Sequence, residues 1–152
     1  MPDNILNIGA GKQPIEGALN MDRLDLPGID LVHDITSPLP LDDETFDRVV
    51  ANYVLCQIAS PEAFVGVLND IHRVLKPEGI LEIRVPNANY PCAFQDPMDC
   101  RYFVPETFDY LNKDHYRYTA FNYGFKPWHD IIILPERGDR LLVTMRKYVK
   151  RD

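Results

Sequence analysis

Short apolar runs of the chain end in residues that could contact a ligand. Gly9 and Gly11 follow the run Ile5–Ile8, and the next two apolar runs end in Asp22 and Asp34. Glycine has no Cβ, so its backbone amide can approach a ligand closely. A carboxylate can accept hydrogen bonds from two vicinal hydroxyls or from an amine. Together these residues suit a nucleoside without a phosphate chain, with one acid for the ribose and one for an adenine amine.

The spacing of these residues disfavours two other nucleotide motifs. A dinucleotide fingerprint needs a third glycine and an acid about 20 residues further on. Here Pro14 stands at the third glycine position, and Asp22 comes soon after Gly11. A phosphate loop needs Gly-Lys-Ser/Thr, whereas Lys12 is followed by Gln13. A nicotinamide oxidoreductase is therefore the weakest of the hypotheses.

The elements that must position these residues alternate along the chain. Apolar runs predict strands at 5–8, 18–22, 30–34, 46–52 and 80–85, and a hairpin of 130–134 with 141–147. Ser60 and Pro61 begin a helix whose apolar residues recur at helical spacing until 76–79, and a short helix is predicted over 105–111. This pattern predicts an α/β, Rossmann-like, open and mostly parallel sheet with a C-terminal antiparallel hairpin and reduced helices on one face. Ligands of such sheets bind beyond the carboxyl ends of the strands.

Composition limits the class of protein. The chain has 152 residues, 45% of them hydrophobic, which predicts a single domain over 1–152. The absence of a long apolar run, of a leading signal sequence and of paired cysteines predicts a cytoplasmic protein without a membrane partner. No His and Cys spacing matches a zinc site, so no metal is expected. The net charge of −7 argues against a nucleic-acid partner.

Three blocks of the sequence resemble a known family. LNIGAGKQPIEGALNMDRLDLPGIDLVHDI, LPLDDETFDRVVANYVL and DIHRVLKPEGILEIRVPN are similar to class I S-adenosylmethionine-dependent methyltransferases, in particular to a small methyltransferase type-11-like group with a shortened first helix. The resemblance covers about residues 4–112. It implies S-adenosyl-L-methionine as the cofactor, bound by Asn7, Gly9, Gly11, Asp22, Arg23, Asp34, Ile35, Asn52 and Tyr53.

The resemblance also assigns parts of the cofactor to these residues. Gly9 and Gly11 would line its methionine part, and Asn52 and Tyr53 would border the methionine amine and the methyl group. Asp22 would bind the ribose hydroxyls. For each aspartate the competing interpretation is an Asx turn or a helix cap at the end of a strand.

Two departures from the family pattern concern catalysis. Where the family has Glu-His after a leucine, this chain has Cys56-Gln57, and Met98-Asp99 replaces a Thr-His pair. Methyl transfer depends mainly on positioning and water exclusion, and a base is needed only when the acceptor must lose a proton. The candidate catalytic residues are Tyr53, Tyr90 and His115, and Asp99 and Tyr116 are further groups of interest.

The predicted function is methyl transfer to an unidentified acceptor, a small molecule or a protein rather than a nucleic acid. The alternative is a catalytically inactive S-adenosylmethionine-binding or partner-regulating module. Aromatic residues concentrated in 90–128 predict a lid and acceptor pocket, with core packing as the competing explanation. The polar alternation of 80–85 predicts a sheet face that is partly solvated and otherwise covered by 113–128 or by a second subunit of a homodimer.

Overall fold

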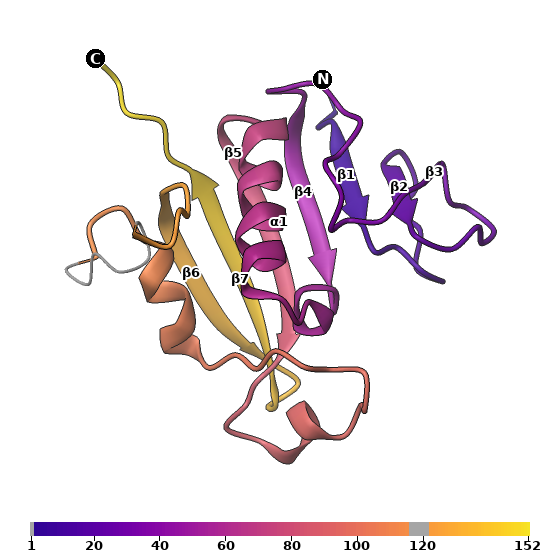
Figure 1. The fold of residues 1–152 in the computed structure, drawn as a ribbon, viewed down its shortest axis with the longest axis vertical. Helices are drawn as coiled ribbons and strands as arrows, with labels where there is room; N and C mark the ends of the chain where they lie inside the picture. The colour runs from indigo at the N-terminus through magenta and orange to yellow at the C-terminus, as the bar shows by residue number, and fades with distance from the viewer. Residues whose placement is uncertain (1, 116–121) are drawn as a thin grey trace.

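The computed structural model describes residues 2–115 and 122–152 and contains a seven-stranded sheet (Figure 1). The strands are β1 (Ile5–Ile8), β2 (Leu19–Asp22), β3 (Leu31–Val32), β4 (Phe46–Asn52), β5 (Leu75–Pro86), β6 (Trp128–Glu136) and β7 (Arg140–Lys147). Their spatial order is β3-β2-β1-β4-β5-β7-β6. Neighbours from β3 to β5 are parallel, and β7 is antiparallel to both β5 and β6. The predicted mostly parallel sheet with a C-terminal hairpin is therefore confirmed.

The connections of the β1–β3 edge consist of turns rather than helices. The segment 9–18 is held by Asn20, whose Nδ2 donates to the Ile15 and Ala18 carbonyls at 3.0 and 3.2 Å and whose Oδ1 accepts from Ile15 N at 2.8 Å. The strand predicted at 30–34 is shorter than expected, since β3 contains only Leu31–Val32. Hydrogen bonds from side chains replace helix packing at this edge.

The helix α1 (Pro61–Val74) begins and ends as its sequence predicts. Ser60 Oγ accepts a hydrogen bond from Ala63 N at 3.2 Å, and Pro61 occupies the first turn, where its missing N–H costs nothing. The helix lies across β4 and β5 on the near side of the sheet in Figure 1. Its buried side chains join the core of the sheet: Phe64, Val67, Leu68, Ile71, His72 and Val74. Three 3₁₀ turns accompany it, namely η1 (Leu55–Gln57), η2 (Pro91–Phe94) and η3 (Pro105–Leu111).

The segment after α1 differs from the prediction. Residues 76–79 were expected to form a turn before a strand at 80–85, but β5 begins at Leu75, directly after the helix. Phe46 pairs with Leu75 and Arg48 pairs with Ile80, so the extra residues form an irregularity within the strand. Glu78 has a φ of 64° there. The structure therefore continues the strand through a bulge instead of starting it afterwards.

The two faces of the sheet differ in polarity. On the side of α1, Leu81, Ile83 and Val85 are fully buried. On the opposite side, Arg84 pairs with Glu136 at 3.1 Å and with Glu82 at 3.7 Å. These groups are partly exposed, so the prediction of a partly solvated face agrees with the structure.

The segment 122–126 lies on the side of α1. Asn69 Nδ2 donates to the Gly124 carbonyl at 2.7 Å, and Lys126 N donates to Asn69 Oδ1 at 2.8 Å. The expectation that 113–128 covers the polar face is therefore wrong for this part of the segment, because its backbone is anchored to the helix. Among the described residues, no helix has the length and apolar character needed to cross a membrane.

Candidate functional site

The glycine turn after β1 has the backbone shape that only glycine adopts readily. Gly9 and Gly11 have φ values of 63° and 52°. A Cβ at Gly9 would overlap Val54 Cγ2, whereas a Cβ at Gly11 would have only ordinary contacts, 3.9 Å from Asp22 Oδ2 and 4.0 Å from the Gly9 carbonyl oxygen. Gly9 therefore lets the segment after β4 pack on the turn, and Gly11 leaves space beside Asp22.

Asp22 lies at the carboxyl end of β2 and faces this turn. Its Oδ2 accepts from Gly11 N at 2.8 Å, and its Oδ1 accepts from Leu24 N at 2.9 Å. The structure thus brings together the glycine and the acid that the sequence singled out. The bond to Leu24 is an Asx turn, so the structural interpretation of Asp22 is also correct.

Asn7 is buried beneath the turn. Its side chain is 2% exposed and donates from Nδ2 to Asn20 Oδ1 at 2.9 Å and to the Gln13 carbonyl at 3.2 Å. These bonds fix the path of the chain after the glycines. The side chain is engaged inside the protein, so its geometry fits a positioning role better than the expected cofactor contact.

Asp34 follows β3 next to Asp22 along the same edge. Its Oδ1 accepts from Thr36 N at 2.9 Å and from Thr36 Oγ1 at 2.8 Å. These two bonds lower the pKa of the carboxyl, so it is ionised at neutral pH. Ile35 is half-buried and packs against the core, while Arg23 is exposed on the loop after β2.

Asn52 is the last residue of β4 and Tyr53 follows it, and both are held by arginines that the sequence did not single out. Arg84 donates to Asn52 Oδ1 at 3.0 Å. Arg140 donates to Tyr53 Oη at 3.1 Å, and its guanidinium carbon lies 5.3 Å from the centre of the tyrosine ring. Tyr53 itself has a φ of 56°, in the left-handed region that residues other than glycine rarely adopt.

The other predicted catalytic residues are not gathered at this site. Tyr90 is 44% exposed on the loop after β5, at the same end of the sheet. His115 stacks on Tyr110, with ring centres 5.5 Å apart. Lys113 N nearby bonds the carbonyl of Trp128, the first residue of β6, so His115 belongs to the opposite end of the sheet. Tyr116 lies outside the described residues.

A cavity of about 220 Å³ opens beside Tyr53 at the carboxyl ends of the strands. Its lining comes from the segments after β4 and β5 and from the start of β7: Tyr53, Gln57, Pro86, Cys92, Gln95, Asp96, Asp99 and Arg140. We call it the strand-end cavity. Its walls combine polar and apolar surface, and two of its residues, Tyr53 and Asp99, are among those the sequence indicated for chemistry.

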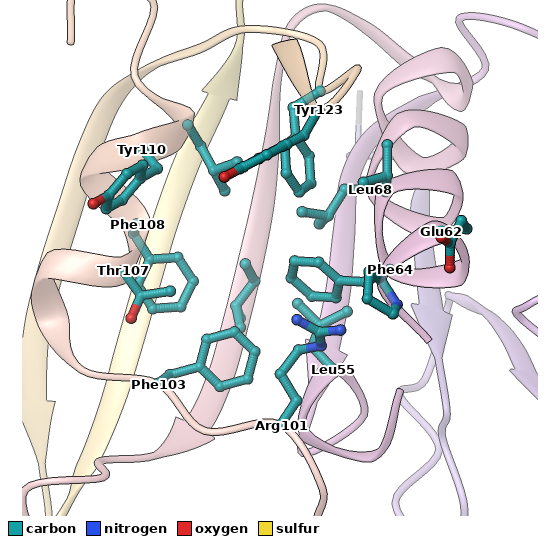
Figure 2. A pocket seen from close by; sticks show the side chains of 15 residues that line it. Leu55, Glu62, Phe64, Leu68, Arg101, Phe103, Thr107, Phe108, Tyr110 and Tyr123 are labelled. Atoms are coloured by element: carbon teal, nitrogen blue, oxygen red, sulfur yellow. The ribbon is translucent and has the colours of Figure 1, made fainter. Parts of the chain in front are cut away.

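A larger cavity of about 740 Å³ lies on the helix side of the sheet, between α1 and η3 (Figure 2). Phe64 and Leu68 reach into it from α1, and Phe103 and Phe108 face them. We call it the helix-side cavity. Phe103 and Phe108 are 1% exposed, so the core interpretation of these aromatic residues is correct, and the lid interpretation is wrong for them.

Cys56 is unsuited to act as a nucleophile. It is 2% exposed, and burial, together with the nearby charge of Asp99, raises the pKa of its thiol to about 12. The thiol therefore stays protonated at neutral pH. Within residues 2–115 and 122–152, no three His, Cys, Asp or Glu side chains are arranged as metal ligands.

Part of the chain matches a known protein family. Residues 10–83, which include Gly11, Asp22, Asp34 and Tyr53, match the family model described as a methyltransferase domain. Over these residues the chain is similar to a methyltransferase domain, and its fold is that of S-adenosylmethionine-dependent methyltransferases. No curated protein sequence matches it.

Solved methyltransferases share this fold at low sequence identity. The 1,6-didemethyltoxoflavin-N1-methyltransferase of Burkholderia thailandensis, solved with S-adenosylhomocysteine, is 18% identical; the match covers 96% of this chain and 71% of that one, with a TM-score of 0.66. An Archaeoglobus fulgidus S-adenosylmethionine-dependent methyltransferase is 16% identical, with 95% and 86% coverage and a TM-score of 0.69. A putative Haloferax volcanii methyltransferase, solved with an activator protein, is 17% identical, with 95% and 82% coverage and a TM-score of 0.60.

Sequence reasoning missed three residues of the candidate site. Val54 packs on Gly9, Arg84 holds Asn52, and Arg140 holds Tyr53. The pairing of β5 with β7 places Arg140 opposite Pro86 at the strand ends. Arg140 stands directly before the predicted strand 141–147, and this position was the available signal. The hairpin prediction did not indicate which other strand would pair with β7.

Proposed function

We propose that the protein binds S-adenosylmethionine at the carboxyl ends of β1, β2 and β4 and transfers its methyl group to a small-molecule or protein acceptor. The observation that carries the proposal is the hydrogen bond of 2.8 Å from Gly11 N to Asp22 Oδ2. It holds an open glycine turn against an acid at the position where the fold binds a nucleoside.

The carboxylate of Asp22 has the capacity that vicinal ribose hydroxyls require. Each of its oxygens accepts one backbone N–H, and a carboxylate offers about four lone-pair sites in total. One site therefore remains on each oxygen. This supports Asp22 as the bidentate acceptor, and the existing Asx turn would fix its orientation.

Asp34 and Ile35 have the chemistry of an adenine site. Both hydrogen bonds from Thr36 reach Oδ1 of Asp34, which leaves Oδ2 for an amine donor. The half-buried Ile35 offers an apolar surface for a ring. Gly9, Gly11, Arg23, Asn52 and Tyr53 complete the proposed cofactor contacts.

The chemistry of transfer needs little from the side chains. When bound, S-adenosylmethionine supplies a methyl group on a positively charged sulfur. Tyr53 has its hydroxyl oxygen engaged by Arg140, so its own proton can be donated to a group in the strand-end cavity. The contribution of this chain is then to orient an acceptor and exclude water.

Calorimetric titration tests the cofactor part of the proposal. S-adenosylhomocysteine should bind and NAD should not, and Asp22→Ala should weaken S-adenosylhomocysteine binding by about 1–3 kcal/mol because charged hydrogen bonds are lost. Asp42→Ala, which removes an exposed acid away from the strand ends, serves as the matched control. Tight NAD binding, or unchanged S-adenosylhomocysteine affinity of Asp22→Ala, would contradict the proposal.

A second candidate function is a cofactor-binding module without transfer. The observation that favours it is Cys56, whose buried, protonated thiol stands where an acid would be available in the family pattern. A screen for methyl transfer over small-molecule, protein and nucleic-acid acceptors separates the two functions. Cofactor binding without any methylated product would support the module.

A further inference from the structure

The strand-end cavity carries two acids that have no cationic partner among the described residues. Asp96 and Asp99 both line it, and neither forms an ion pair with another described residue. The contact of Asp99 with Gln57 Nε2 is long, at 3.5 Å. A positive group entering this cavity would meet two carboxylates with available lone pairs.

The segment that carries these acids is fixed to the body of the protein. Cys100 N and Arg101 N both donate to the Cys56 carbonyl, at 2.9 and 3.0 Å. Tyr102 Oη donates to the Asp99 carbonyl at 3.2 Å, and Met98 N donates to Asp96 Oδ1 at 2.9 Å. The carboxylates are therefore presented by an ordered turn, which reduces the entropic cost of binding.

The positively charged residue of the cavity lining, Arg140, already has partners within the protein. Arg140 donates to Tyr53 Oη at 3.1 Å and lies 3.6 Å from Asp139. The rise of the Cys56 thiol pKa, to which Asp99 contributes after burial, agrees with a negative local field. The lining also includes Pro86 and the ring of Tyr53, which can contact the carbon part of a ligand.

We propose that the strand-end cavity is the acceptor site and that it selects a small basic amine, with Asp96 and Asp99 holding the ammonium group and Tyr53 beside the nitrogen. This inference rests on the proposed function, since it names the acceptor class of the same site. Anionic acceptors are disfavoured by the two carboxylates, and neutral ones lack the positive charge that the carboxylates attract.

Methyl transfer to a basic amine conserves atoms and charge. The bound ammonium gives one proton to a carboxylate of the cavity, which frees the nitrogen lone pair. A nitrogen–carbon bond then forms as the methyl–sulfur bond breaks, with its electron pair staying on sulfur. The product is the methylated ammonium and the thioether. No oxidant, reductant or further reactant is required.

Binding to the cofactor-free protein gives a readout that does not depend on activity. The probes are 2-phenylethylamine, its neutral analogue 2-phenylethanol and the anion 3-phenylpropionate, titrated calorimetrically at pH 7.5. The amine should bind about tenfold or more tightly than the alcohol, and the anion should bind weakest. Asp99→Asn and Asp96→Asn should each weaken amine binding severalfold, whereas Asp109→Asn, an exposed acid on η3, should not.

Equal affinity for amine and alcohol, or unchanged amine affinity in both cavity variants, would overturn the acceptor class. Thermal unfolding of each variant, compared with the parent, shows whether a loss reflects folding. S-adenosylhomocysteine titration of the same variants keeps the two proposals apart. If S-adenosylhomocysteine fails to bind the parent protein, the proposed function fails, whatever the amine result; if it binds while the amine does not, only the acceptor class fails.

Discussion

The strand-end edge and the helix side of the sheet are stabilised in different ways. At the edge, side-chain oxygens of Asn20, Asp22 and Asp34 accept hydrogen bonds from turn amides, and helices are absent from segments 9–18 and 23–30. On the helix side, Phe103 and Phe108 are stacked in the core, with ring centres 5.5 Å apart. The comparison teaches that binding and folding rest on separate groups of residues, so substitutions should separate affinity from stability.

The largest expected effect is on the helix side. Phe103→Ala removes a side chain that is 1% exposed and should lower the free energy of unfolding by about 3–5 kcal/mol, because a cavity is left in the core. Urea denaturation measures this loss. Phe94→Ala, whose ring is 60% exposed, should change the stability by less than about 1 kcal/mol. The folded fraction of Phe103→Ala should bind S-adenosylhomocysteine normally; lost affinity would break the comparison.

A substitution at the glycine turn should affect both properties. Gly9→Ala adds a Cβ that overlaps Val54 at a φ of 63°, and the cost in unfolding free energy should be about 2–4 kcal/mol. S-adenosylhomocysteine affinity should fall as well, since the turn must shift. Gly138→Ala has a similar φ of 79° but open space around it, so it should cost only about 1–2 kcal/mol without loss of affinity. Equal effects of the two substitutions would exclude the role of the Val54 contact.

Acid should weaken the helix side before the strand-end edge. Burial lowers the pKa of His72 from 6.5 to about 4, helped by the charge of Lys147. As the pH falls, His72 is therefore protonated in the unfolded chain before it is protonated in the folded protein. The free energy of unfolding should decline by up to about 3 kcal/mol between pH 6.5 and pH 4. The pKa of Asp34 is lowered in the folded protein. Its contribution to the free energy of unfolding is therefore complete above pH 3.8 and is lost only below that pH.

Urea denaturation at several values of pH measures this profile, with His72→Gln as the variant that removes the titrating group. The free energy of unfolding of His72→Gln should be nearly independent of pH between 6.5 and 4.5. A parent profile that is flat over this range would contradict the assignment. S-adenosylhomocysteine affinity at pH 6, where the carboxylate of Asp34 is ionised, should match that at pH 7.5.

The smallest expected effect concerns the start of α1. Ser60→Ala removes the acceptor of the hydrogen bond from Ala63 N and should lower the unfolding free energy by about 1 kcal/mol. Ser60→Asp keeps an oxygen at the cap and should restore the stability. Thermal unfolding is sensitive enough for both. Cofactor affinity should be unchanged in either variant, and a change would show that α1 and the binding edge are coupled.

The sequence predicted the elements whose signals are local. The cap at Ser60, the alternation of β7 and the glycines after β1 each depend on residues close together in the chain, and all three agree with the structure. The bulge at 76–79 was missed because Pro77 and Gly79 are typical of a turn, while the flanking pairs of Leu75 and Ile80 with β4 keep the segment within the strand. Tertiary pairing outweighed the local preference there.

The candidate site was predictable where its residues follow strands of a parallel sheet. Gly11 and Asp22 meet because the carboxyl ends of β1 and β2 share an edge. Arg84, Arg140 and Val54 could not be found in this way, since their contacts depend on register and on a strand inserted from far along the sequence. His115 has a residue type suited to catalysis, but its place in the chain brings it to the other end of the sheet.

The position of β7 between β5 and β6 has a consequence for synthesis of the protein. β6 emerges from the ribosome before β7, yet it has no partner in the sheet until β7 pairs with both neighbours. Arg140 arrives on that same strand, so the nascent chain can complete its core and its Tyr53 contact only in one late step. A chain interrupted before residue 140 would therefore lack the strand-end cavity, even though most of its lining had already been made.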